Sequence, residues 1–266
     1  MATQLIMAKS PEEAIGAKNA SSVFVAGGTE VNRLGSEAAS AADTLISLKQ
    51  CDGISDIENK DGIVRIGAMC TFQQMIESAE VPAYLKEAAH FMASRTKRNM
   101  ATIGGNIGAM RSDSYLIPVL YAAGAALEVL THEGKKEIGI RSVAEGAKEN
   151  DGLITAVSVP KDVKVISKRY ANTAQSHAVL TMSAALAEDG LHMAGAVKNV
   201  GILHFCDLEK AFTDDPDISE EAVIKMVKEC TGLSTADDMF GSDAYKRYLI
   251  AVTAFDLHRQ LSGKEV

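Results

Sequence analysis

The sequence contains no tryptophan, and aromatic residues make up only 5% of its 266 residues. Proteins that hold single-stranded nucleic acids commonly stack the bases on aromatic side chains, which are scarce here. The formal net charge of −8 also disfavours a polyanionic partner, because like charges repel each other. Both features argue against a function in nucleic-acid binding.

Cysteine is scarce as well, and no two cysteines form a C-x-x-C pair. The six histidines show no metal-binding spacing such as i, i+4. We therefore expect no iron–sulfur cluster or zinc site built by this chain alone, and reduced, mostly structural thiols. The four cysteines are Cys51, Cys70, Cys206 and Cys230.

Long apolar runs are also missing, since no stretch of about 18 consecutive apolar residues occurs and no membrane span is predicted. The first residues lack the basic and apolar regions of a signal peptide, so a cytoplasmic location is expected. Hydrophobic residues nevertheless make up 47% of the sequence. This content and length predict a globular chain of two or three lobes with a substantial core.

Two glycine-rich segments stand far apart in the sequence. The first, Val25 to Glu30, reads V-A-G-G-T-E, and the second, Thr102 to Ile107, reads T-I-G-G-N-I. Glycine has no Cβ, so a ligand can approach the backbone closely, and successive N–H groups in such a turn form a concave anion site. Two such turns brought together predict a site for the phosphates of a dinucleotide, although a single Gly-Gly pair is also typical of an ordinary turn.

These segments resemble the paired FAD-binding loops of the vanillyl-alcohol-oxidase-like fold. More narrowly, the chain is similar to the FAD-binding subunits of molybdenum hydroxylases, the group of xanthine, carbon monoxide and nicotinate dehydrogenases. In that family the loops read A-G-G-T-D/E and T-I-G-G-N. The segment 242–249, S-D-A-Y-K-R-Y-L, is similar to the family stretch S-x-x-Y-R/K-R-x-L, so the resemblance covers essentially the whole chain.

The resemblance implies an α+β, PCMH-type FAD-binding fold with lobes at 1–52 and 53–162. A C-terminal α+β domain, a three-stranded antiparallel sheet plus helices, is expected at 163–266. The local patterns agree: Ser10-Pro11 is typical of a helix start, and Asp61-Gly62 predicts a hairpin. Strands are predicted at 165–172, 178–187 and 191–200, followed by helices at 220–230 and 243–261.

The resemblance also implies which residues contact FAD. In the first motif, Gly27 and Gly28 would let backbone N–H groups point at a phosphate, whereas a strand-to-helix turn without a ligand is the alternative. In the second motif, the threonine and asparagine side chains would bind ligand oxygens. The implied contacts are Phe24, Val25, Ala26, Gly27, Gly28, Thr29, Glu30 and Val31, together with Thr102, Gly104, Gly105 and Asn106.

Other implied contacts lie outside the motifs. The family places an aspartate at position 115, but Tyr115 stands here, so either Asp113 substitutes for it or the contact is missing. Lys168 aligns with a lysine near the flavin ring and is otherwise a solvated strand lysine. Either Ile154 or Thr155 aligns with an apolar residue against the isoalloxazine.

Residues shortly before the second motif complete the candidates. Met92 aligns with a ring-contacting residue. Lys97 and Arg98 are compatible with phosphate binding, with a partner subunit or with a solvated basic turn.

The resemblance implies an electron-transfer role for the chain. Its partners would be a molybdopterin-binding large subunit and a [2Fe-2S] small subunit, and electrons would pass through FAD to NAD or another acceptor. The substrate would be a purine or another N-heterocycle.

Among the many acidic residues, no pair stands out as an acid–base dyad. The alternatives are a scaffold or assembly subunit with weak FAD binding, and a stand-alone FAD oxidoreductase, against which the missing substrate lobe and flavin-attachment site argue.

Overall fold

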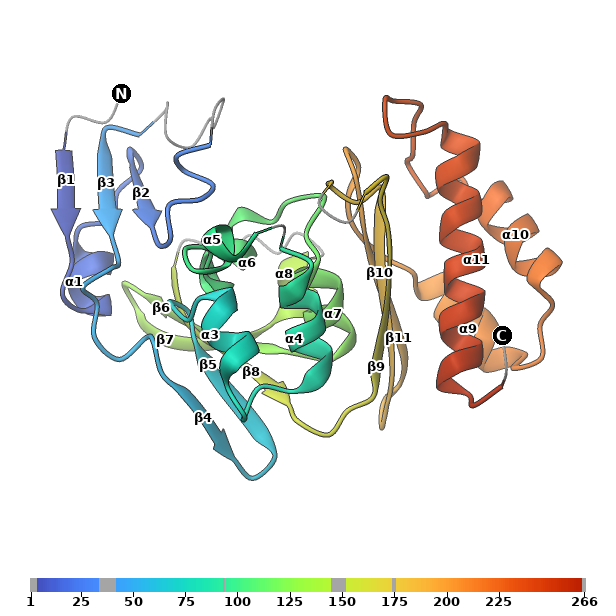
Figure 1. Cartoon of the computed structure of the whole chain (residues 1–266), viewed down its shortest axis with the longest axis horizontal. Helices are drawn as coiled ribbons and strands as arrows, with labels where there is room; N and C mark the ends of the chain where they lie inside the picture. Colours follow the sequence, from blue (N-terminus) through green and yellow to red (C-terminus); the bar gives the residue numbers. More distant parts are fainter. Residues whose placement is uncertain (1–3, 34–41, 93, 145–151, 174–175, 265–266) are drawn as a thin grey trace. The chain divides into compact units, whose positions relative to one another are not determined.

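The computed structural model describes residues 4–33, 42–92, 94–144, 152–173 and 176–264 (Figure 1). The chain divides into two compact units, and the second unit takes one segment from the middle of the first. Unit 1 comprises Met1–Ala109 and Ala125–Lys161, and unit 2 comprises Met110–Gly124 and Asp162–Val266.

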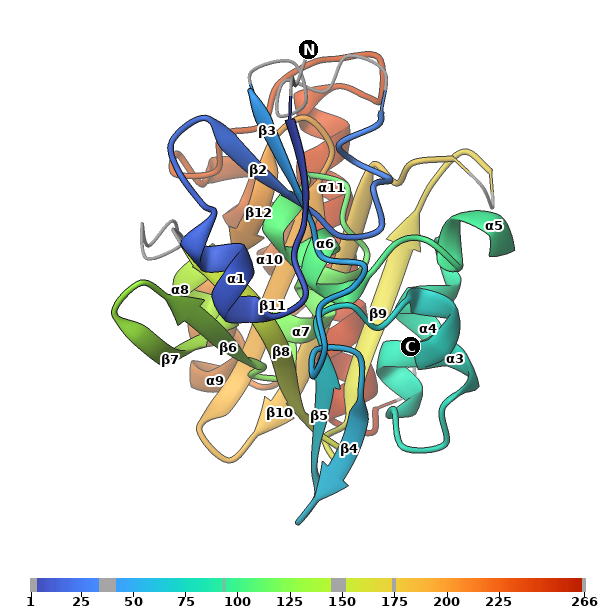
Figure 2. The same ribbon diagram turned by 90° about the vertical axis from the view of Figure 1, so that its left-hand side faces the viewer.

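Unit 1 begins with a small parallel sheet, which Figure 2 shows together with the helix α1. Its strands lie in the order β1-β3-β2, with β1 at Gln4–Met7, β3 at Thr44–Ser47 and β2 at Ser22–Val25. Helix α1, Pro11–Gly16, begins where Ser10 Oγ accepts a hydrogen bond from Glu13 N. This helix start matches the prediction from Ser10-Pro11.

A five-stranded antiparallel sheet forms the rest of the β structure of unit 1, in the order β4-β5-β8-β6-β7. Asp61 and Gly62 both have positive φ, 52° and 81°, as the tight turn of the predicted hairpin requires. The strands are β4 (Ile57–Lys60), β5 (Ile63–Gly67), β6 (Ala126–Thr131), β7 (Gly134–Gly139) and β8 (Leu153–Pro160).

Short helices connect these strands. The capping box at Thr71 and Gln74 starts the first of them, because each side chain satisfies a backbone N–H of the other residue. The helices of unit 1 after α1 are α3 (Phe72–Glu77), α4 (Ala83–His90), α5 (Arg95–Arg98), α6 (Ile103–Ala109) and α8 (Ile140–Ala144).

Unit 2 is an antiparallel sheet in the order β12-β11-β10-β9 with helices on both faces (Figure 1). Its central strand β10 is buried from Leu180 to Ala185, since helices cover both of its faces. Its strands are β9 (Val165–Tyr170), β10 (Leu180–Ala187), β11 (Gly190–Val197) and β12 (Gly201–His204), and its helices are α7 (Leu116–Ala122), α9 (Cys206–Asp214), α10 (Glu220–Glu229) and α11 (Asp243–Leu261).

Arg247 lies in the segment 242–249, which resembles the family stretch, and it binds the end of α10. Its guanidinium donates to the carbonyl oxygens of Val227, Cys230 and Leu233 at 3.1, 2.8 and 2.5 Å. It also contacts the Asp243 carboxylate, with Nε 3.0 Å from Oδ2. Arg247 therefore satisfies the carbonyl groups left open at the end of α10 and in the loop that follows.

The predicted fold class is confirmed, but the sheet of unit 2 has four strands, not three. The fourth, β12, is only four residues long and lacks a clear alternating pattern.

The predicted domain boundaries at 52/53 and 162/163 stay predictions. Residues 110–124 belong to unit 2, because the apolar helix α7 packs on β10 and β11. Among the described residues, no helix is long and apolar enough to cross a membrane.

Candidate cofactor site

The two glycine motifs meet in unit 1. A Cβ placed on Gly27 would lie 1.6 Å from the carbonyl oxygen of Met100, and one placed on Gly105 would lie 3.5 Å from Ala26 Cβ. The backbone of the first motif therefore rests directly on the segment that leads into the second. Only glycine fits at position 27, because any side chain would overlap the Met100 peptide.

The first motif follows strand β2 and offers a row of backbone donors. Gly28 has a φ of +73°, and its carbonyl accepts a hydrogen bond from Asn32 N at 3.0 Å. Among the described residues, the N–H groups of Gly27, Gly28 and Thr29 have no acceptor. Successive N–H groups without side chains around them form a cradle for anionic oxygens. This cradle fits the diphosphate of a dinucleotide.

Three other residues of the first motif make contacts within the protein. Phe24 and Ala26 are partly buried and pack against the core that contains Ile46. The carboxylate of Glu30 forms an ion pair with Arg33, 2.9 Å between Oε1 and NH2. This pairing neutralises the one acidic side chain of the motif, so that it does not repel an anion bound beside it.

The second motif is not a turn but the first turn of helix α6, and Thr102 is its buried entry residue, 2% exposed. Gly104 and Gly105 therefore offer no free N–H to a ligand, and the predicted contact of this motif with FAD stays a prediction. The backbone N–H groups of this turn all donate within the protein. Gly104 N donates to Ala68 O at 2.9 Å, and Gly105 N donates to Thr102 Oγ1 at 3.1 Å. On either side of them, Ile103 N donates to Cys70 O and Asn106 N to Thr102 O, both at 3.0 Å.

Gly104 allows α6 to lie against the central strand β8 of the five-stranded sheet. A Cβ on Gly104 would lie 2.6 Å from Ala68 Cβ and 2.9 Å from Ala68 O. Ala68 N in turn donates to Thr155 O of β8 at 2.9 Å. The glycine is therefore needed for helix packing, and its N–H is not available to a ligand.

Ile154 and Thr155 lie in β8, next to this contact. The ladder between β6 and β8 shifts its register between Glu128 and Val129, and Thr155 Oγ1 donates to Glu128 O at 3.2 Å. Thr155 is buried, whereas Ile154 is partly exposed. Of the two, Ile154 keeps apolar surface that a ligand can contact.

Two further candidates, Asp113 and Lys168, lie in unit 2 and are already paired there. The Asp113 side chain is 3% exposed and contacts Arg111 Nε, Lys198 Nζ and His177 Nδ1 at 2.8, 2.5 and 2.8 Å. Burial alone would raise the pKa of Asp113, but the hydrogen bonds and charges of Arg111 and Lys198 hold it well below its usual range. Asp113 thus serves as an internal anchor for two cations.

Lys168 forms an ion pair with Asp256 of α11, 2.5 Å between Nζ and Oδ2. It is therefore not the solvated strand lysine of the alternative interpretation. At position 115, Tyr115 donates to Ser176 O at 3.3 Å, and the Arg169 guanidinium lies 5.0 Å from its ring centre. An aromatic–cation contact thus stands where the family has a carboxylate.

Residues before the second motif hold the backbone of α5. Arg98 donates from Nε to Gln73 Oε1 at 3.1 Å and from NH1 to Met92 O at 2.9 Å. Helix α4 ends at His90, and Arg98 joins the segment that follows it to α5. Met92 therefore contributes its carbonyl to this arrangement.

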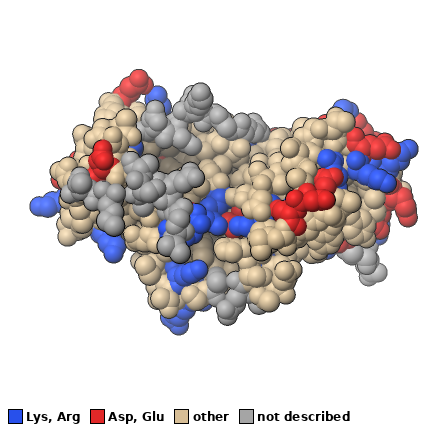
Figure 3. Space-filling view, turned by 90° about the horizontal axis from the view of Figure 1, so that it is seen from above, with Lys and Arg blue, Asp and Glu red and all other residues tan. Residues whose placement is uncertain are grey.

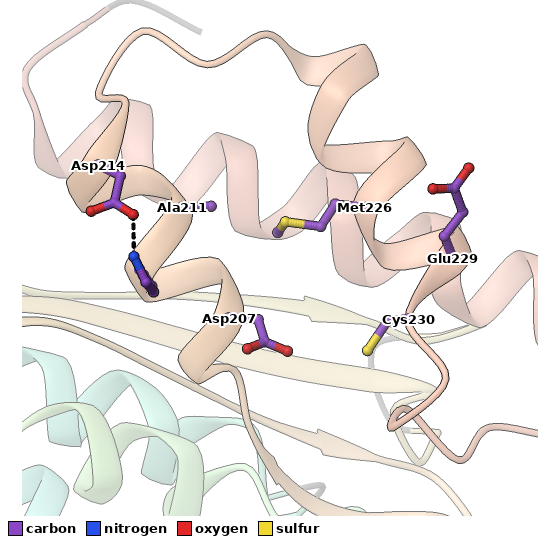
Figure 4. Close-up of a pocket in the computed structure, with 7 residues that line it drawn as sticks. Asp207, Ala211, Asp214, Met226, Glu229 and Cys230 are labelled. Atoms are coloured by element: carbon purple, nitrogen blue, oxygen red, sulfur yellow. Dashed lines mark hydrogen bonds and ion pairs between the residues drawn. The ribbon is translucent and has the colours of Figure 1, made fainter.

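A surface pocket of about 470 Å³ lies in unit 2 between α9 and α10 (Figure 4). Met226 and Ala211 line its apolar part, and Asp207, Asp214 and Glu229 surround them. Lys210 also lines the pocket and pairs with Asp214, but the lining keeps a net negative charge that disfavours an anionic cofactor. The pocket is therefore not a site for a dinucleotide.

Charge elsewhere on the molecule forms no single field. On the face drawn in Figure 3, basic and acidic side chains lie side by side in small mixed groups, with uncharged surface between the groups. Within the part of the chain that the structure describes, no group of three metal-ligating side chains is found. The glycine cradle is thus the feature of unit 1 best suited to an anionic ligand.

Comparison with known proteins identifies the family. A family model described as the FAD binding domain in molybdopterin dehydrogenase matches residues 1–162. The chain belongs to this family. Its members are FAD-dependent oxidoreductase subunits, and FAD is the cofactor of the family.

Among curated proteins, the uncharacterized protein YgfM of Escherichia coli is 31% identical over 254 residues, covering 91% of this chain and 90% of that protein. A xanthine dehydrogenase FAD-binding subunit of E. coli is 33% identical over 127 residues, or 44% of this chain and 42% of that protein.

Two solved structures share the fold. Quinoline 2-oxidoreductase from Pseudomonas putida 86 gives a TM-score of 0.83 at 17% identity, covering 99% of this chain and 98% of that chain. Carbon monoxide dehydrogenase from Hydrogenophaga pseudoflava gives 0.81 at 19% identity, covering 99% and 96%.

The packing role of Gly104 can be tested against Gly108 in the same helix, where a Cβ would have nothing within 4 Å. Gly108→Ala should stabilise the protein by about 0.5–1 kcal/mol through helix propensity. Gly104→Ala should instead destabilise it by about 1–3 kcal/mol through overpacking against Ala68. Urea unfolding measures both, and equal effects of the two changes would contradict the packing role.

The Asp113 cluster predicts a dependence of stability on pH. Because the folded-state pKa lies below the unfolded value of about 3.9, the stabilisation is fully present above pH about 4–5 and declines as pH falls through lower values. Asp113→Asn should cost about 3 kcal/mol at pH 7, and less in acid. Urea unfolding from pH 7 down to about 3 checks this. Asp61→Asn, in the exposed β4–β5 turn, is the control and should show little change.

Proposed function

We propose that this chain is the FAD-binding electron-transfer subunit of a multi-subunit molybdenum hydroxylase. In the complex it would pass electrons from a partner [2Fe-2S] cluster through FAD to NAD or another acceptor. The observation that carries the proposal is the row of N–H groups at Gly27, Gly28 and Thr29 without protein acceptors. Membership of the FAD-binding family supports the choice of cofactor.

Different residues of unit 1 would contact different parts of the cofactor. The cradle of the first motif would bind the diphosphate, and the hydroxyl of Thr102 and the amide of Asn106 would lie beside it at the start of α6. Ile154 would contribute apolar contact to the ring system. FAD, when bound, supplies the electron-accepting and electron-donating chemistry that protein side chains lack.

The rest of an oxidoreductase would come from other chains. The described residues hold no cluster of metal ligands, so we infer that molybdopterin and [2Fe-2S] groups lie on a large and a small partner subunit. The names of the structural neighbours, a quinoline oxidoreductase and a carbon monoxide dehydrogenase, support this kind of complex. We propose a purine or another N-heterocycle as the substrate class.

One observation favours a second candidate, a scaffold or assembly subunit with weak FAD binding. Asp113, the nearest carboxylate to the family position at Tyr115, has both carboxylate oxygens engaged by cations. A missing contact to the adenosine half would weaken binding without changing the fold. The affinity for FAD separates the two candidates: a micromolar or tighter dissociation constant supports the first.

The diphosphate role of the first motif can be tested at Gly28 with two nearly isosteric changes. Asparagine and aspartate tolerate positive φ better than other residues, so both variants should fold. Gly28→Asp places a negative charge beside the diphosphate and should weaken FAD binding about tenfold relative to Gly28→Asn. Flavin fluorescence titration measures both affinities, and equal values would remove the diphosphate from this loop.

The subunit role predicts that the chain alone does not hydroxylate a heterocycle. Co-expression with the molybdopterin and [2Fe-2S] subunits of a molybdenum hydroxylase should give a complex that oxidises a purine or a related ring and reduces NAD or a dye. Size-exclusion chromatography and a substrate-dependent absorbance assay test this. Hydroxylation by the purified chain alone would refute the proposal, and a complex without flavin would favour the scaffold candidate.

A further inference from the structure

Three basic side chains lie on the short helix α5, directly before the second motif. Two of them are engaged within the protein. Arg95 NH2 lies 3.1 Å from Glu77 Oε1, and Arg98 donates to Gln73 Oε1 and Met92 O. These two arginines join α5 to α3 and to the segment after α4, Arg95 through an ion pair and Arg98 through hydrogen bonds to neutral oxygens.

The third basic residue, Lys97, differs from its neighbours. Its backbone is fixed, because its N–H donates to Ser94 Oγ at 3.2 Å and its carbonyl accepts from Met100 N and Ala101 N at 3.0 and 2.7 Å. Its side chain is exposed, and within the described part of the chain its ammonium has no acidic or hydrogen-bonding partner. A cation on a fixed backbone is thus left without a counter-charge.

The backbone contacts place Lys97 beside the donor cradle. Gly27, the first residue of the cradle, packs on the carbonyl of Met100, and Met100 N is hydrogen-bonded to Lys97 O. The flexible four-carbon stem of a lysine reaches across this short separation. The nearby carboxylate of Glu30 is neutralised by Arg33, so the one acidic side chain of the first motif does not compete for the lysine.

We propose that Lys97 supplies the positive charge that compensates the diphosphate of FAD. This inference rests on the proposed function and adds a named residue to it. Backbone N–H groups donate hydrogen bonds to phosphate oxygens but carry no net charge. A lysine acts as a point charge toward phosphate, so Lys97 adds the positive charge that the backbone N–H groups of the cradle lack.

The test compares Lys97→Gln and Lys97→Glu with Lys60→Glu. Lys60 lies at the tip of the β4–β5 hairpin, at the opposite end of unit 1 from α5 in Figures 1 and 2, and it is equally exposed. At about 0.05 M salt, Lys97→Gln should raise the dissociation constant of FAD roughly fivefold, and Lys97→Glu more. Both effects should shrink strongly at about 1 M salt, where the screening length is about 3 Å. Lys60→Glu should leave the affinity unchanged.

Three outcomes would overturn the inference. If Lys97→Glu matches Lys60→Glu while Gly28→Asp still weakens binding, FAD binds at the cradle but Lys97 takes no part. A loss of affinity that does not depend on salt and accompanies a lower melting temperature would mean that Lys97 is a structural residue. If the wild-type chain binds no FAD at all, this inference and the proposed function fail together.

Discussion

The candidate site depends on the contact between Gly27 and the peptide of Met100. No side chain fits at position 27, because a Cβ there would lie 1.6 Å from the Met100 carbonyl oxygen. This contact fixes the loop after β2 on the segment that enters α6. It also leaves the N–H groups that follow, from Gly27 to Thr29, pointing away from protein acceptors. The donor cradle is a consequence of this close packing.

The two glycine motifs look alike in sequence but differ in physical role. In the first, the absence of side chains exposes backbone donors to a ligand, and Gly28 adopts a φ of +73°. In the second, Gly104 lets α6 approach Ala68, and the helix's first N–H groups are already bonded. One motif therefore leaves backbone donors without acceptors among the described residues, and the other allows a helix to pack closely.

Most charged side chains near the candidate residues are paired within the protein. Asp113 and Lys168, both candidates from the resemblance, form ion pairs inside unit 2. The arginines of α5 hold the backbone in place, and Glu30 is neutralised by Arg33. Lys97 stands apart from these groups, because its ammonium has no such partner among the described residues.

The sequence by itself determined the local elements with strong signals. Ser10-Pro11 starts α1 and Asp61-Gly62 makes a tight hairpin, because each depends on interactions between near neighbours. The strand β12 and the helix α9 carried no comparable signal and were missed.

The sequence also identified both glycine motifs, but only the tertiary structure decided their roles. Whether an N–H of Gly104 is free depends on Ala68, and whether Asp113 is available depends on Lys198, residues distant in the chain. No local pattern records which distant acceptor or cation a group will meet. The packing of α6 on β8, which engages the N–H of Gly104 but not those of Gly27 and Gly28, was therefore decided by the fold.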